Sequence, residues 1–191
     1  TYTIAFNLND YANANAYFLS NISLKIDGVE QVANGNMASD DNSAFFKKEK
    51  RGDIVSCPIR DTYIKREMQA GVPTEYVEEF TEVAKRCIMV ETDDMVEAAW
   101  DTQLWIKTSN PLTAGASYEF SAEVYAWHEA APGTQLHNDP GQYVHWGAIG
   151  NVSFTEEWNT VNLTGTIAAE GAGTYTIAFN LNDYANANAY F

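Results

Sequence analysis

The stretch TYTIAFNLNDYANANAYF occupies residues 1–18 and recurs without a mismatch at residues 174–191. Its apolar residues alternate: Ile4, Phe6 and Leu8 fall on one side of an extended strand, and the residues between them fall on the other. The run DYANAN that follows is rich in turn-forming residues, and a second apolar strand is predicted from Ala16 to Ile26. A half-buried strand, a turn and another strand together predict an all-β fold.

The duplication bears on domain organisation. Repeats that evolve inside one domain drift apart, so two identical copies indicate either a piece of a longer tandem array or the overlapping ends of one unit. Only the first copy continues into Leu19, and only the second has its natural predecessor, residues 155–173. We therefore expect residues 1–28 to be the C-terminal strands of a module, permuted or from a preceding repeat. Residues 34–191 are expected to form a β-sandwich that ends in the second copy.

Composition limits the class of partner. The chain has 191 residues, of which 46% are hydrophobic and 13% aromatic, as in a globular domain with a sizeable core. Its 11 basic and 26 acidic residues give a formal net charge of -15, which argues against nucleic acid or an anionic membrane as partner. No apolar run is long enough to span a bilayer. Cys57 and Cys87 are either one disulfide or two buried thiols.

The rest of the chain consists of short strands separated by turns, which predicts a β-sandwich jelly roll. The expected strands are 54–59, 86–91, 100–108, 118–127, 143–149 and 159–168, with 133–141 as a loop or bent strand. One segment departs from this pattern. Between Thr74 and Arg86 the apolar residues recur with a helical period, acidic residues come early and basic residues come last, so one short helix is predicted over 74–86.

The faces of the strands that point away from the predicted core are rich in aromatic and amide side chains. A glycan offers flat apolar ring faces and a fringe of hydroxyl groups, so a protein that binds it needs aromatic platforms beside planar amides and imidazoles. Such groups are the candidate carbohydrate-binding residues: Asn7, Gln103, Trp105, Tyr125, Trp127, Gln135, His137, Tyr143, His145 and Asn180.

Each of these residues also has a purely structural interpretation. The strand phase of Trp105 and Trp127 points away from the core, which favours binding, whereas Trp100, Trp146 and Trp158 are interpreted as core residues. The imidazoles of His137 and His145 lack the ligand spacing of a metal site, so hydrogen bonding to sugar hydroxyls is the better interpretation.

Several motifs resemble those of the family 4/9/22-type carbohydrate-binding modules, especially the modules inserted in family 10 xylanases of gut and rumen Bacteroidetes. They are NGNM at 34–37, WDTQLWI at 100–106, NPLTAG at 110–115, YEF at 118–120, TQLH at 134–137 with PGQYVHW at 140–146, and IAFNLN at 177–182. The resemblance covers most of the repeat unit.

The resemblance implies a β-sandwich jelly roll whose concave face binds a β-1,4-linked plant polysaccharide, most simply xylan, without catalysis. It also implies a bacterial, secreted or cell-surface location and a parent endo-1,4-β-xylanase. Modules of this kind often hold a structural Ca²⁺ through acidic residues, but here those places read Ala38 and Ser20-Asn21. The resemblance therefore leaves Ca²⁺ open, and no other cofactor is expected.

Two other function classes compete with binding. A glycan hydrolase needs two carboxylates at a defined separation, and Glu119 and Glu123 share one strand face. An assembly module would use the surplus copy of the repeated strand to form a strand-swapped homo-oligomer, because a fold with one place for that strand has two copies available.

Overall fold

The computed structural model describes residues 2–7, 15–48, 52–68, 78–92, 101–137, 143–168 and 178–179. These residues form strands and turns, and no helix occurs among them, so none of them builds a helix that could span a membrane. The strands are β1 (Tyr2–Asn7), β2 (Ala16–Ile26), β3 (Val29–Glu30), β4 (Phe45–Lys48), β5 (Ile54–Ser56), β6 (Ile59–Arg60), β7 (Tyr63–Met68), β8 (Glu78–Val83), β9 (Cys87–Glu91), β10 (Gln103–Thr108), β11 (Ser117–Ala126), β12 (Gly133–His137), β13 (Tyr143–Asn151), β14 (Asn159–Thr166) and β15 (Ala178–Phe179).

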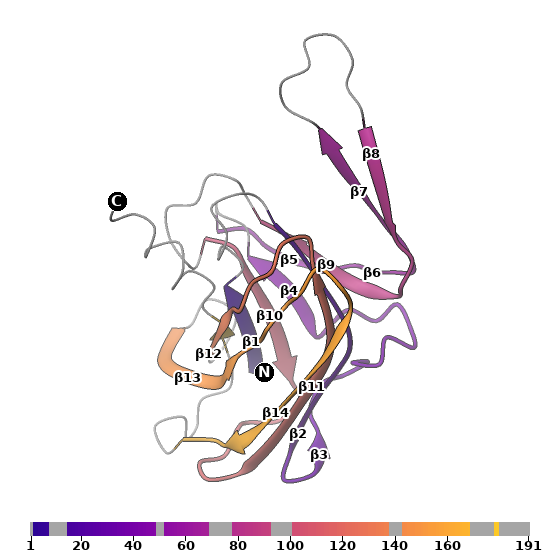
Figure 1. Ribbon diagram of the computed structural model, residues 1–191. Coiled ribbons are helices and arrows are strands. Elements are labelled where there is room, and N and C mark those ends of the chain that lie inside the picture. Colours follow the sequence, from indigo (N-terminus) through magenta and orange to yellow (C-terminus); the bar gives the residue numbers. More distant parts are fainter. Residues whose placement is uncertain are drawn as a thin grey trace, which may run out of the picture.

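Two large sheets pack into an all-β sandwich, and β7 and β8 form a third, two-stranded sheet (Figure 1). The larger sheet has the order β13-β12-β15-β1-β10-β4-β5, and the other has the order β14-β11-β2-β9-β6 with β3 paired to β2. Residues 1–28 supply a strand to each sheet, β1 to the first and β2 to the second. The prediction of an all-β sandwich from the alternating strands is therefore confirmed.

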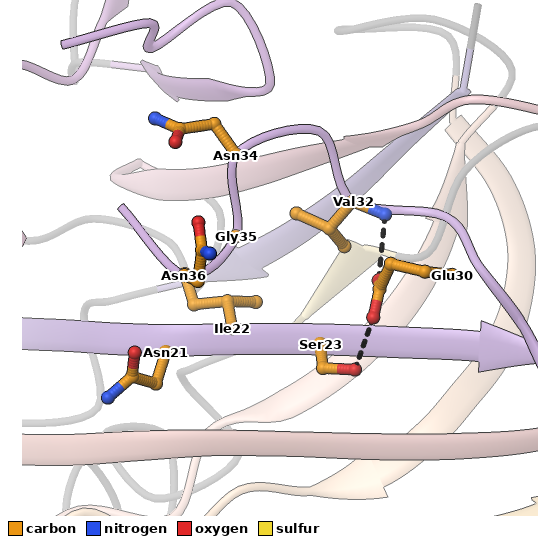
Figure 2. A pocket seen from close by; sticks show the side chains of 8 residues that line it. All are labelled: Asn21, Ile22, Ser23, Glu30, Val32, Asn34, Gly35 and Asn36. Carbon is orange, nitrogen blue, oxygen red and sulfur yellow. Dashed lines mark hydrogen bonds between the residues drawn. The ribbon is translucent and has the colours of Figure 1, made fainter. Parts of the chain in front are cut away.

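A β-bulge interrupts β2 where it crosses β11. The pairing shifts by one residue between Ser23↔Ser121 and Ser20↔Glu123, and Asn21 takes a left-handed conformation with φ 47°. Asparagine tolerates this conformation better than most residues, so it suits the extra position of a bulge. The turn that follows β3 packs against the same place, where the Ile22 amide donates to the Gly35 carbonyl at 2.8 Å (Figure 2).

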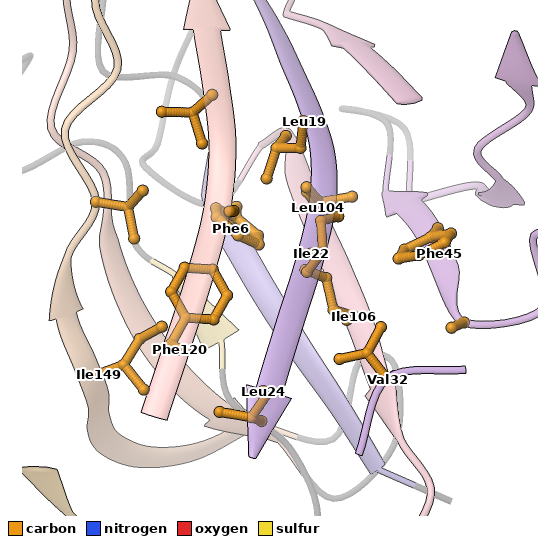
Figure 3. Close-up of a cluster of buried hydrophobic side chains, with 14 of the residues drawn as sticks. Phe6, Leu19, Ile22, Leu24, Val32, Phe45, Leu104, Ile106, Phe120 and Ile149 are labelled. Carbon is orange, nitrogen blue, oxygen red and sulfur yellow. The ribbon is translucent and has the colours of Figure 1, made fainter. Parts of the chain in front are cut away.

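The main core lies between the two sheets. Figure 3 shows side chains of both sheets in the space between the strands, among them Phe6 of β1, Leu104 of β10, Ile22 of β2 and Phe120 of β11. Phe6 also makes an edge-to-face contact with Phe154, with ring centroids 6.4 Å apart. Alternate residues of each strand enter this core, as the sequence pattern predicted.

The predicted helix is wrong over the part of 74–86 that the structure describes. Glu78–Val83 is strand β8, which pairs antiparallel with β7 from Met68↔Glu78 to Tyr63↔Val83 and forms a hairpin that projects from the sandwich (Figure 1). Residues 74–77 lie outside the described part. Helical periodicity is a local signal, and here pairing with a second strand satisfies the backbone groups instead.

The cysteine alternative is settled in favour of thiols. Cys57 and Cys87 are both free and fully buried, so neither forms a disulfide with the other. Burial raises the pKa of each thiol to about 12. A thiol with such a pKa is protonated and unreactive at neutral pH, so both cysteines act as small apolar residues.

Candidate functional site

Four of the predicted binding residues lie together on the outer face of the larger sheet. They are Gln103 and Trp105 of β10 and Gln135 and His137 of β12, which we call the Trp105 cluster. Their sequence neighbours Leu104, Ile106 and Leu136 belong to the main core, so the four side chains point the opposite way. β1 lies between β10 and β12 and pairs with both strands, which sets the distance between the two pairs of residues.

Within the Trp105 cluster, Trp105 contacts both Gln103 and His137. The indole Nε1 of Trp105 donates a hydrogen bond of 3.1 Å to Oε1 of Gln103. On the other side, the Trp105 and His137 rings are tilted by 47° with centroids 6.0 Å apart. The Trp105 ring therefore lies between an amide and an imidazole, each of which can donate and accept hydrogen bonds.

The Trp105 cluster is buried although it lies outside the main core. Trp105 is 0% exposed, and its three partners are at most 9% exposed. The row of side chains on this outer face continues from Trp105 onto the neighbouring strand β4. There Phe46 is the register partner of Trp105 and is only partly buried. The Lys107 ammonium lies 4.5 Å from the centroid of the Phe46 ring, a cation–π contact that covers this end of the row.

Burial controls the charge of His137. Desolvation, with a smaller contribution from the nearby Lys48 ammonium, lowers the pKa of His137 from 6.5 to about 4. The imidazole is therefore neutral at physiological pH and carries one donor and one acceptor nitrogen. Such a ring can exchange hydrogen bonds with hydroxyl groups without the cost of burying a charge.

The lowered pKa of His137 predicts that stability falls in mild acid. Because the folded-state pKa lies below the unfolded value, the contribution is complete above pH 6.5 and is lost as the pH falls towards 4. A shift of this size corresponds to about 3 kcal/mol. Urea unfolding of the wild type and of His137→Gln across this pH range should show the variant losing less stability. His128→Gln is the control, because the His128 side chain is 37% exposed. If the free energies of unfolding of the wild type and of His137→Gln change in parallel with pH, the prediction is contradicted.

Tyr125 and Trp127, which were expected on the same face, lie on the other sheet. Tyr125 belongs to β11, and Trp127 directly follows the last residue of that strand. Val124 and Ala126 enter the main core, so the rings of Tyr125 and Trp127 point outward from the smaller sheet. The predicted residues whose side chains the structure describes therefore fall into two groups with the core between them. Strand phase tells that a residue points away from the core, but it does not tell which of the two sheets carries it.

The group on the smaller sheet is an aromatic cluster, here called the Trp127 cluster, made of Phe18, Tyr125, Trp127 and Trp158. Phe18 and Tyr125 have ring centroids 5.1 Å apart, and Tyr125 and Trp158 are 5.7 Å apart. Trp158 was predicted in the core but is partly exposed here. Its ring carries the Lys85 ammonium at 4.4 Å, and the same ammonium pairs with Glu123 at 2.7 Å. Sequence reasoning missed this because Lys85 was assigned to a helix.

The remaining predicted residues are placed only in part. Asn7 is the register partner of Gln103, and Tyr143 is the register partner of His137, so both backbones border the Trp105 cluster. His145 lies in the same strand as Tyr143. The described structure includes only the backbones of these three residues, and Asn180 lies outside it.

A pocket of about 370 Å³ lies at the bulge of β2, bordered by the turn that contains Asn34 and Asn36 (Figure 2). The one carboxylate on its lining belongs to Glu30. One oxygen of that carboxylate accepts hydrogen bonds of 3.0 Å from the amides of Leu24, Gln31 and Val32, and the other accepts from the Ser23 hydroxyl. Sequence reasoning did not identify this pocket, because the bulge that opens it depends on how β2 pairs with β11.

The NGN motif at residues 34–36, where the modules that this chain resembles often bind Ca²⁺, lines this pocket, so its side chains can be compared with what Ca²⁺ needs. The side-chain oxygen of Asn34 accepts from the Ser39 amide and that of Asn36 accepts from the Ala38 amide, so both are already engaged. Ca²⁺ needs six to eight oxygen ligands, usually with several carboxylates. The donor set of this pocket does not fit that requirement. Across the described residues, no three His, Cys, Asp or Glu side chains gather closely enough to hold a metal ion.

Comparisons with known proteins do not assign this chain to a family. No protein-family model matches the chain, and no significant match was found among curated proteins or solved structures. The function is therefore argued from the residues themselves.

Proposed function

We propose that this protein is a non-catalytic module that binds a β-1,4-linked plant polysaccharide, with xylan as the first candidate, through the outer face of its larger sheet. The observation that supports this is the Trp105 cluster, in which an indole outside the main core contacts both an amide and a neutral imidazole. Burying polar side chains costs free energy unless they are hydrogen-bonded, so a natural protein keeps them where they have a function. Recognition of hydroxyl groups is a function that fits these residue types.

The burial of the Trp105 cluster restricts how a sugar can reach it. A bound chain either displaces the atoms that cover Trp105 or contacts the row at its Phe46 end, where the ring is partly exposed. Stacking on an indole does not distinguish glucose from xylose rings, so selectivity depends on which hydroxyl groups meet Gln103, Gln135 and His137. The net charge of -15 suits a neutral polymer better than an anionic one.

Binding without hydrolysis is supported by the state of the carboxylates proposed as catalytic. A general acid in a glycosidase needs a raised pKa. Glu123 has the opposite shift, because hydrogen bonding to the Lys85 ammonium lowers its pKa. Glu119, its neighbour on the same face, is exposed. We infer that the module is carried to its substrate as part of a secreted or cell-surface glycoside hydrolase.

Affinity gel electrophoresis tests this proposal directly. Gels that contain xylan, mixed-linkage glucan, glucomannan or hydroxyethylcellulose should retard the protein, with the strongest retardation in xylan, while reducing-sugar release from each polymer stays at background. Single open sites of this kind bind with about -4 to -8 kcal/mol, which is millimolar to micromolar. Unchanged migration in all four gels would refute the polysaccharide proposal, and sugar release would refute its non-catalytic part.

A further inference from the structure

One place in the larger sheet is filled by the first copy of the repeated stretch. β1 pairs antiparallel with β10 at six positions, from Tyr2↔Thr108 to Asn7↔Gln103. On its other side it pairs with β12 at Thr3↔His137 and Ile4↔Leu136. We call this place beside β10 the β1 slot.

The second copy lies next to the first in the same sheet. β15 pairs with β1 in parallel, and the paired residues are equivalent members of the two copies, Ala5↔Ala178 and Phe6↔Phe179. β15 also pairs with β12 at Gln135↔Ala178. β12 is thus shared between the two copies, with Leu136 and His137 facing β1 and Gln135 facing β15.

The contacts that hold the first copy depend only on residues that the second copy repeats. Phe6 is 0% exposed and lies in the main core. The second copy repeats all of β1 at residues 175–180, with Phe179 in the place of Phe6. The β1 slot therefore cannot distinguish the two copies by their side chains.

We propose that the β1 slot accepts either copy of this strand, and that residues 175–180 of the same chain replace residues 2–7 in it. The replacing strand comes from the same chain because Ala178 and Phe179 are already paired beside Ala5 and Phe6, one strand away from the slot. A tethered strand at that distance competes at a far higher effective concentration than a strand from another molecule. The fold thus contains a two-state element whose states differ in which copy pairs with β10.

Aspartate substitutions in the full chain test this exchange. Phe6→Asp puts a charge into the main core if only the first copy fits the slot, and it is tolerated if the second copy takes over. We expect Phe6→Asp and Phe179→Asp each to keep a cooperative urea transition and a monomeric mass, with a modest shift of midpoint. Phe6→Asp/Phe179→Asp should lose the transition. Phe45→Asp, at a core position that is not duplicated, is the control that should lose it as a single change.

The outcomes separate the alternatives. If Phe6→Asp loses the transition as completely as the double variant, only the first copy fits the slot and the proposal is wrong. If Phe6→Asp folds only as an oligomer in light scattering, the second copy comes from another chain, which also overturns exchange within the chain. The milder series Phe6→Ala, Phe179→Ala and Phe6→Ala/Phe179→Ala repeats the test without a buried charge. If the copies exchange, the double variant loses more free energy of unfolding than the two single variants together. If only the first copy fits the slot, the double variant loses as much as Phe6→Ala alone.

Discussion

Trp105→Ala is expected to abolish retardation in xylan gels, whereas Trp127→Ala should leave it within twofold of the wild type. The two variants remove the same side chain from opposite sides of the sandwich, because Trp105 lies in β10 of the larger sheet and Trp127 directly follows β11 of the smaller sheet. Truncating a central aromatic residue of a binding site costs about 2 kcal/mol or more, which is more than tenfold in affinity. The pair of variants therefore tests which sheet carries the binding face, and calorimetry with xylo-oligosaccharides gives the affinities.

A fold control is needed because Trp105 is fully buried and its removal destabilises the sheet by about 3–5 kcal/mol. Gln135→Ala removes a smaller side chain from the same cluster and should weaken binding about fivefold through lost hydrogen bonding, with the urea midpoint close to wild type. Full affinity in folded Trp105→Ala and Gln135→Ala, together with weak binding by Trp127→Ala, would move the site to the smaller sheet.

Much of the fold could be predicted because its signals are local. The alternation of Ile22, Leu24 and Ile26 marks the second half of β2, and the alternation around Phe120 marks β11, because these segments have one face in the core. The β7–β8 hairpin could not be predicted in the same way. The spacing of apolar residues around Phe80 also fits a helix, and only the pairing with β7 makes this segment a strand.

The candidate site was predictable at the level of strands and not at the level of sheets. The sequence places Gln103 with Trp105 and Gln135 with His137, since residues two apart in a strand share a face. That these pairs come together depends on β1 lying between their strands, and that Trp127 is excluded depends on β11 joining the other sheet. Sheet order depends on pairing between strands that are distant in the sequence. The sequence therefore predicted one site that contained both Trp105 and Trp127, whereas the structure has them on different sheets.

Gly35→Ala is expected to cost about 3 kcal/mol or more in the free energy of unfolding. A β-carbon at this position would lie 1.9 Å from the carbonyl oxygen of Ile22 and 3.0 Å from its carbonyl carbon. Both atoms are backbone of β2, which is held at this bulge by pairing with β11, so they cannot rotate away as a side chain would. The turn must separate from the strand, and the 2.8 Å hydrogen bond from the Ile22 amide to the Gly35 carbonyl is lost with it.

The matched control is Gly28→Ala, in the turn between β2 and β3. Gly28 has a left-handed backbone with φ 79°, but no atom lies within 4 Å of an added β-carbon. Its cost is therefore conformational strain alone, about 1 kcal/mol. Urea unfolding of both variants should rank Gly35→Ala well below Gly28→Ala in stability. Equal losses would mean that the turn around Gly35 moves freely from β2, and that the pocket beside Asn21 is not held by this close contact.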